Sequence, residues 1–150
     1  MSEICLLSPS VMTEIDRLGG QWEPQSTEEP RQINGHQIPV AIGQFLYEIR
    51  WPQRTYCSSE QSSMWVWDMS FGISGFLEDV TIKNRNDRSL VYFGMADGGN
   101  YCLILDIDDL NPIDPYIYKV DHDDPDQCLY DWLRLSCFLR ELNVETGMLD

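Results

Sequence analysis

Apolar residues follow two periods along this chain of 150 residues, a helical period toward both ends and a strand period in the middle. The first helical stretch is SPSVMTEIDRLGG (8–20), in which a serine that can cap a helix precedes Pro9. Proline suits the first turn of a helix, and Gly19 with Gly20 supplies a stop signal. The segment therefore predicts a short helix around 9–18.

A second apolar stretch, IPVAIGQFLYEIRWP (38–52), also repeats at helical spacing. One proline stands at its entry and another beyond its last apolar residue, which predicts a second helix near 39–50. The segments 21–37 and 53–63 are polar and rich in Pro, Gly, Asn or Ser, so we expect both to be loops.

The middle of the chain changes to alternating positions that are rich in aromatic and β-branched residues, as is typical of strands. MWVWDMSF (64–71) predicts one such strand. SLVYFGM (89–95) and YCLILDI (101–107) are separated by a glycine-containing turn and predict a hairpin. PYIYKVD (115–121) predicts the next strand of the same sheet.

The helical period returns in LYDWLRLSCFLREL (129–142). One apolar face of this predicted helix carries Trp132, Leu135, Phe138, Leu139 and Leu142. We expect the last three to pack against a sheet that carries Leu103 and Leu105. The order of elements predicts a single α+β domain over residues 1–150, with a central antiparallel meander and with N-terminal helices and a C-terminal helix packed against it.

The charge of the chain is strongly negative, because 10 Lys and Arg residues stand against 25 Asp and Glu residues, for a net charge of −15. Residues 1–75 carry 9 acids and 4 bases, whereas 76–150 carry 16 acids and 6 bases. Eight aspartates fall within 106–126 beside one base, Lys119; they are Asp106, Asp108, Asp109, Asp114, Asp121, Asp123, Asp124 and Asp126. This acidic segment is either a solvated face or a recognition surface, and composition does not separate the two.

An acidic field excludes two classes of partner. Nucleic-acid binding needs a basic surface that displaces counterions from phosphates, and anionic membranes also attract basic segments. We therefore expect no nucleic acid and no membrane as partner. The field would attract a basic protein surface instead.

The cysteines and the N-terminus predict a cytoplasmic protein. The five cysteines form an odd set without a C-x-x-C pair, and they are Cys5, Cys57, Cys102, Cys128 and Cys137. We interpret them as reduced and mostly buried thiols. The N-terminus lacks the basic and apolar regions of a secretory signal, and no run of apolar residues is long enough for a membrane span.

The stretch FGMADGGNYCLILDIDD (93–109) offers two kinds of ligand site, and its residues fit neither well. Its G-x-x-x-x-G is followed by Asn100 and Tyr101, where a phosphate-binding loop needs Lys and Ser or Thr. Counted from Asp106 as an EF-hand calcium loop, the sixth position lacks Gly and the twelfth lacks Glu. We expect a hairpin here, with no cofactor and no dedicated metal site, although weak calcium binding by the acidic segment stays open.

The histidines and tryptophans leave further alternatives. His122 beside Asp121 could serve as a general base, but no nucleophile-elbow motif accompanies it, and we favour an exposed strand end without catalytic residues. Trp65 and Trp67 share one face of a predicted strand and are expected in the core. Trp22 and Trp51 flank loops and are candidate exposed anchors for a partner.

The order of four short motifs resembles the SMI1/KNR4 family, also called the SUKH superfamily. IPVAIGQFL (38–46) stands where that family has a Leu-Pro-led helix that ends in Phe-Leu. FGMADGGNYCLILD (93–106) resembles its Phe-Gly strand, glycine-containing turn and strand ending in Asp. IYKVDHDD (117–124) is similar to a Val-Tyr-x-Val/Ile-Asp-His-Asp strand, and CFLREL (137–142) to a final helix closing on Phe-Leu. The resemblance spans most of 9–142.

This resemblance implies a non-enzymatic α+β binding domain, because bacterial members of the family are widely immunity proteins that neutralise secreted toxins, many of them nucleases. We therefore expect a cytoplasmic immunity protein that binds a basic cognate toxin, with the eight aspartates, Trp22 and Trp51 as its contacts. One alternative is an intracellular scaffold or regulatory domain. Another is a hydrolase centred on His122.

Overall fold

The computed structural model describes residues 4–24, 32–33, 36–58, 66–71, 83–85, 88–98, 100–107, 109–121 and 133–144. The helices in these ranges are α1 (Pro9–Arg17), α2 (Val40–Tyr47) and α4 (Leu135–Arg140). The longer strands are β8 (Arg88–Ala96), β9 (Tyr101–Asp106) and β10 (Tyr116–Asp121). The short strands are β1 (Gln21–Trp22), β2 (Gln32–Ile33), β3 (His36–Gln37), β4 (Ile49–Arg50), β5 (Tyr56–Ser58), β6 (Ser70–Phe71), β7 (Lys83–Arg85), β11 (Leu133–Arg134) and β12 (Leu142–Val144).

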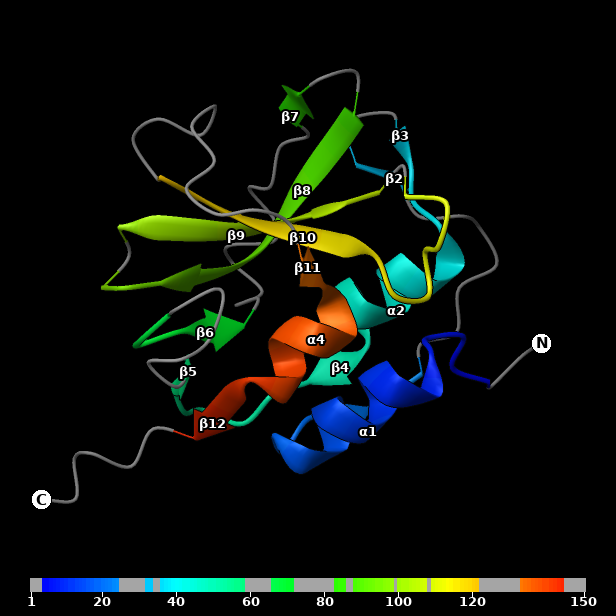
Figure 1. Ribbon diagram of the computed structural model, residues 1–150. Helices are drawn as coiled ribbons and strands as arrows, with labels where there is room; N and C mark the ends of the chain where they lie inside the picture. Colours follow the sequence, from blue (N-terminus) through cyan, green and yellow to red (C-terminus); the bar gives the residue numbers. More distant parts are fainter. Residues whose placement is uncertain are drawn as a thin grey trace, which may run out of the picture.

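An antiparallel sheet forms the centre of the molecule (Figure 1). Its strand order is β11-β10-β9-β8-β6, and β7 pairs with the first part of β8. Because β8, β9 and β10 are consecutive neighbours, the meander predicted from 89–95, 101–107 and 115–121 is confirmed. The predicted α+β class is confirmed with it.

One glycine in β8 allows the edge strand β6 to approach β8 closely. The β8–β9 register shifts between Tyr92 and Gly94, and Gly94 pairs with Phe71 of β6. A Cβ atom at Gly94 would lie 2.7 Å from the backbone oxygen of Ser70. No larger residue fits at this position without moving β6, because the obstacle is backbone.

Helix α1 forms where the sequence predicts it. The hydroxyl of Ser8 accepts a hydrogen bond from the Val11 N–H, and Pro9 occupies the first turn. After the last turn, Gly19 takes a left-handed conformation with φ +93°, which glycine adopts without steric cost. Arg17 then ties the end of α1 to the C-terminal part of the chain, since its Nη2 donates to the carbonyl oxygen of Leu139 at 2.8 Å.

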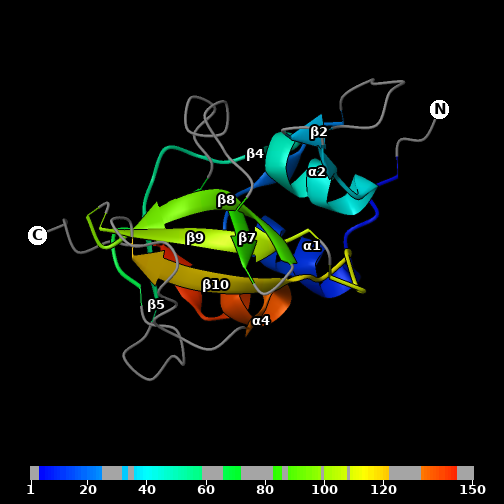
Figure 2. The same ribbon diagram turned by 90° about the horizontal axis from the view of Figure 1, so that it is seen from above.

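The main core lies between the helices and one face of the sheet, as Figures 1 and 2 show for α1 and α4. Alternate residues of β9, Leu103 and Leu105, are fully buried in it. Phe138, Leu139 and Leu142 belong to the same cluster, so the expected packing against the sheet is confirmed. On the opposite face of the sheet, a smaller buried cluster contains Cys102, Ile104 and Val120.

The C-terminal helix is shorter than predicted. Within 129–142 the structure describes 133–142, and only Leu135–Arg140 is helical. Residues 133–134 form β11 and pair with β10, whereas β12 begins at Leu142 and pairs with β5. Backbone pairing with distant strands thus limits the helix at both ends, although the apolar period of the sequence continues. Trp132 lies outside the described residues.

Pairing between distant segments also corrects three other predicted boundaries. The second helix ends at Tyr47, because 49–50 form β4 and pair with β1. The segments 21–37 and 53–63, expected to be loops, contribute the short strands β1, β2, β3 and β5. Each of these strands is two or three residues long, which is too short to leave a period in the sequence.

The predicted strand at 64–71 is reduced to its end. β6 covers Ser70–Phe71, and Met69 forms an isolated bridge with Tyr56. Trp67 lies before the strand and is exposed, so the expectation that it belongs to the core is wrong. Trp65 lies outside the described residues.

Two expectations from composition concern cysteines and membranes. Cys5, Cys57, Cys102 and Cys137 are free thiols; Cys102 is buried and the other three are half-buried. Cys128 lies outside the described residues. In the part of the chain that the structure describes, no helix is long and apolar enough to cross a membrane.

Candidate functional site

The structure places three of the predicted contact aspartates, and it uses them inside the protein. Asp106, at the end of β9, is fully buried, and Asp109 is buried as well. Asp114 is half-buried, with both carboxylate oxygens bonded to Ser136. Because a buried carboxylate cannot reach a partner, the prediction of a recognition surface is wrong for Asp106 and Asp109.

The other predicted aspartates are not placed by the structure. Asp121 is the last residue of β10, but its side chain is outside the described part. Also outside it are Asp108, His122, Asp123, Asp124 and Asp126. The part that these residues play in binding stays a prediction from sequence.

Both candidate anchor tryptophans pack against the main core. The indole Nε1 of Trp22 donates to the Glu48 carboxylate at 2.9 Å. The Trp51 ring stacks on the Phe71 ring with centroids 3.7 Å apart and planes 6° apart. Each is half-buried and engaged in the fold, so the expectation of exposed anchors is not met at Trp22 or Trp51.

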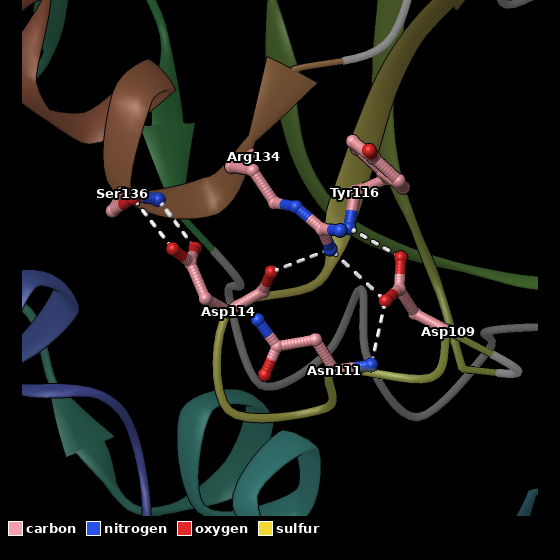
Figure 3. A network of polar contacts seen from close by, with 6 residues as sticks. All are labelled: Asp109, Asn111, Asp114, Tyr116, Arg134 and Ser136. Carbon is pink, nitrogen blue, oxygen red and sulfur yellow. Dashed lines mark hydrogen bonds and ion pairs between the residues drawn. The ribbon is translucent and has the colours of Figure 1, made fainter.

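The loop between β9 and β10, residues 107–115, is held by one carboxylate (Figure 3). Oδ1 of Asp109 accepts from the Asn111 N–H at 2.8 Å, and Oδ2 accepts from the Tyr116 N–H at 3.1 Å. Nη1 of Arg134, in β11, donates to Oδ1 at 3.0 Å. The carboxylate thereby fixes the start of the loop, its turn and the strand that follows.

Arg134 joins the two ends of this loop. Its Nη1 also donates to the carbonyl oxygen of Asp114 at 3.0 Å, and its guanidinium lies 3.6 Å from the centroid of the Tyr116 ring. The position of Arg134 follows from β11, whose residues pair with the start of β10. A planar guanidinium suits this place because it donates in its plane and stacks through its face.

Asp114 connects the same loop to α4. This helix begins after Arg134 without a capping side chain of its own. Oδ1 of Asp114 accepts from the Ser136 N–H at 2.8 Å, and Oδ2 accepts from the Ser136 hydroxyl at 2.6 Å. The loop thus supplies the acceptor that the first turn of α4 lacks.

The charges of this network are mutually stabilised. Burial alone would raise the pKa of Asp109, but hydrogen bonds from Asn111, Arg134 and Tyr116 outweigh it and hold the pKa below its ordinary value. Burial would likewise lower the pKa of Arg134, and Asp109 raises it above its usual value. Asp109 and Arg134 are therefore both charged at neutral pH. We call the contacts among Asp109, Asp114, Arg134 and Ser136 the loop clamp.

The loop clamp holds apolar side chains in solvent. Leu110 follows Asp109 directly and is 100% exposed, and Ile113 is exposed as well. The exposed apolar residues at this end of the molecule are Ile4, Leu6, Val40, Leu110 and Ile113. We call these five residues the apolar end. Loops that present binding groups from a rigid scaffold are a common form of recognition site.

Hydrogen bonds tie the segments of the apolar end together. The Ser8 N–H donates to the carbonyl oxygen of Ile113 at 3.0 Å. The side chain of Gln44 in α2 accepts from the Leu6 N–H at 2.7 Å and donates to the Ile4 carbonyl oxygen at 3.1 Å. Both views of the ribbon show the N-terminal segment, the start of α2 and the loop at the same end of the molecule (Figures 1 and 2).

This arrangement offers apolar contact from a fixed backbone. The two carboxylates of the loop clamp already hold donors, and among the described residues no group of three or more His, Cys, Asp and Glu side chains is placed to bind a metal ion. The sequence reasoning missed Leu110, Ile113 and Arg134. The available signal was the pair of large apolar residues in DLNPID (109–114), a segment whose Asn, Pro and Asp predict a turn.

In comparisons with known proteins, no family model, no curated protein and no solved structure matches the chain. The candidate site is therefore defined by its own geometry.

Proposed function

We propose that the protein is a non-enzymatic binding protein of the immunity type, which binds a cognate toxin domain in the cytoplasm and neutralises it. The observation that carries this proposal is the apolar end on its clamped loop. A fully exposed leucine has no contact in the isolated chain that would explain its position, and the neighbouring Asp109–Arg134 ion pair holds its backbone in place. A preformed apolar contact of this kind lowers the entropic cost of binding.

The charge of the chain supports a basic partner. A net charge of −15 attracts a positively charged surface over a distance and raises the association rate at low salt. A toxin that acts on nucleic acid needs such a surface for its own substrate. The apolar end would then supply contact, and the acidic field would supply steering.

Two further observations agree with this proposal. The motifs at 38–46, 93–106, 117–124 and 137–142 resemble the SMI1/KNR4 family, in which immunity proteins are common. The four cysteines that the structure describes are free thiols, which suits a reducing compartment.

The direct test uses the protein encoded by the gene next to that of this chain. We expect its toxic domain to form a complex with the purified chain and to stop inhibiting growth when the chain is co-expressed. Association should slow steeply as salt rises, because the charge attraction is screened. Failure of the chain to bind the neighbouring protein and to protect cells would overturn the proposal and leave the scaffold alternative.

The site itself is tested by two substitutions of opposite charge at one position. Leu110→Arg and Leu110→Asp both remove the apolar contact, but only the arginine would repel a basic partner. We expect both to weaken binding by about tenfold or more, with Leu110→Arg the weaker binder. Gln53→Arg, at an exposed residue of another segment, is the control for added charge. Equal affinity of all three variants and the native chain would exclude the apolar end as the contact.

A further inference from the structure

Trp67 lies apart from the apolar end and is also exposed. Of the tryptophan, tyrosine and phenylalanine side chains that the structure describes, it is the exposed one, at 43%. It accompanies the β8–β9 turn, whereas Leu110 follows β9 at the other end of that strand. Six residues of strand separate the two ends by roughly 20 Å.

The backbone of Trp67 is fixed by Asp97 at this turn. The Trp67 N–H donates to Oδ1 of Asp97 at 2.9 Å, and the Asp97 N–H donates to the carbonyl oxygen of Trp67 at 2.7 Å. These two hydrogen bonds join the backbone of Trp67 to Asp97. They hold Trp67, whose indole is exposed, beside the tip of the β8–β9 hairpin of the central sheet.

Asp97 is itself held from inside the protein. Its Oδ2 lies 2.6 Å from Nζ of Lys119 in β10, and the side chains of the lysine and the aspartate are 2% and 6% exposed. The ammonium group also lies 4.6 Å from the centroid of the Tyr101 ring. The buried ion pair between Lys119 of β10 and Asp97 of the β8–β9 turn therefore holds Asp97 in place, and Asp97 in turn holds the backbone of Trp67.

The backbone on both sides of this contact is unusual. Asp68 and Asp97 have φ of 49° and 58°, and they are the residues other than glycine with positive φ in the described part of the chain. Gly98 follows in the same region with φ 72°, and a Cβ built on it would lie 3.7 Å from Cη2 of Trp67. Left-handed backbone at non-glycine residues is unfavourable and gathers at functional sites.

We propose that Trp67 is a platform on which an arginine side chain of a basic partner protein stacks. Tryptophan is the aromatic residue with the strongest attraction for a cation over its face, and arginine is the cation found most often in that position. The chain carries 25 Asp and Glu residues against 10 Lys and Arg residues, so its field draws cationic side chains to exposed positions. Asp68, the next residue in the chain, is half-buried and adds one more negative charge to this segment.

The assignment of the partner rests on the proposed function, whereas the assignment of the platform rests on the geometry at Trp67 and on the charge of the chain. A partner that uses both surfaces would contact the two ends of β9. Rigid aromatic residues at interfaces act as anchors because little conformational freedom is lost when they are covered. The contacts with Asp97 fix the backbone of Trp67, whose side chain is 43% exposed.

The platform is tested without the partner by a peptide probe. The probe is capped Gly-Arg-Gly, and its control is capped Gly-citrulline-Gly, which has nearly the same shape but no charge. The indole N–H resonance of Trp67 in the ¹⁵N-labelled chain is assigned with Trp67→Phe. We expect this resonance to shift with millimolar arginine peptide and not with citrulline peptide. Equal shifts with both peptides, or no shift with either, would overturn the platform.

The partner assignment is tested with the toxin domain of the neighbouring gene. We expect Trp67→Ala to weaken binding by about tenfold and Trp67→Phe to lose less, since phenylalanine retains a ring for the cation. Unchanged affinity in Trp67→Ala, in a native chain that does bind the toxin, would overturn the platform as a toxin contact while the proposed function stands. If the native chain does not bind the toxin, the proposed function fails, and the peptide experiment alone decides the platform.

Discussion

Buried carboxylates are the residue-scale feature that sets this acidic chain apart from a protein with a merely acidic surface. Asp97 and Asp109 are both buried, and each binds one of the ten basic residues of the chain. Asp97 pairs with Lys119 at the β8–β9 turn, and Asp109 pairs with Arg134 at the β9–β10 loop. Two of the few cations thus position the two exposed apolar features, at opposite ends of one strand.

The first prediction concerns Arg134. We expect Arg134→Ala to lower the free energy of unfolding by about 1–3 kcal/mol, because Asp109 stays buried with fewer donors. Arg134→Lys should recover part of this loss, since it restores the charge without the planar contact with Tyr116. Urea denaturation measures both variants. Stability of Arg134→Ala within about 0.5 kcal/mol of the native protein, the usual surface value, would show that the loop clamp is not an energetic constraint.

The second prediction concerns pH. The pKa of Asp109 is lowered in the folded protein, so the native state favours the ionised form more than the unfolded chain does. Its contribution to stability is therefore complete above the ordinary aspartate pKa of about 3.9, and it is lost as pH falls through the lower folded-state pKa. The difference in unfolding free energy between the native protein and Asp109→Asn should be largest near neutral pH.

That difference should shrink as pH falls below about 4. Comparison with the variant is needed because 25 acidic residues titrate in the same range. Asp68→Asn, at a half-buried aspartate outside the loop clamp, is the control for the loss of one carboxylate. A difference for Asp109→Asn that stays constant down to pH 3 would contradict the lowered pKa.

At the scale of elements, α4 is a short helix held between two strands. Residues 133–134 pair with β10 before it, and 142–144 pair with β5 after it. Asp114 accepts a hydrogen bond from an N–H of its first turn, and Arg17 of α1 donates a hydrogen bond to a carbonyl oxygen near its end. Such a helix owes its stability to packing and to neighbours, because six residues are too few to form a helix alone.

The third prediction compares two leucines. Leu139 in α4 is fully buried and Leu110 is fully exposed. Leu139→Ala should cost about 2–5 kcal/mol of unfolding free energy, through lost burial and the cavity that remains. Leu110→Ala should change stability by less than about 0.5 kcal/mol, as at other surface positions. A large effect at Leu110 would mean that its side chain stabilises the fold and is not available for contact with a partner.

At the scale of the whole molecule, the net charge of the chain does not indicate which of its carboxylates are buried. The net charge of −15 describes the entire chain, but three of the aspartates that the structure places, Asp97, Asp106 and Asp109, are buried. Asp109 and Asp114 both belong to the loop clamp, and the carboxylate of each accepts hydrogen bonds from the protein. These oxygens therefore already accept hydrogen bonds from the protein in the absence of a bound ion.

The fourth prediction is that calcium has no dedicated site. Millimolar Ca²⁺ should leave the melting temperature within about one degree of its value in EDTA, with Mg²⁺ as the control for ionic strength. A site filled at 100 times its Kd would add about 2.7 kcal/mol, which corresponds to a shift of several degrees in a domain of this size. Such a shift with Ca²⁺ and not with Mg²⁺ would show that the acidic segment binds the ion.

The elements whose causes are local could be predicted from the amino-acid sequence. The cap at Ser8, the proline after it and the glycine at the end define α1 within a few residues. Alternation and turn chemistry define β8, β9 and β10, and a helical period marks the buried face of α4. These signals are strong because each depends on neighbours along the chain.

The ends of the helices and the burial of particular charged residues depend on contacts between distant segments of the chain. β11 and β12 replace predicted helix because partners in β10 and β5 take their backbone hydrogen bonds. Asp109 is buried because Arg134, 25 residues away, reaches it, and Leu110 is exposed because the same contact fixes the loop around it. A local pattern states the period of a segment but not its partner, and burial of a charge depends on the partner.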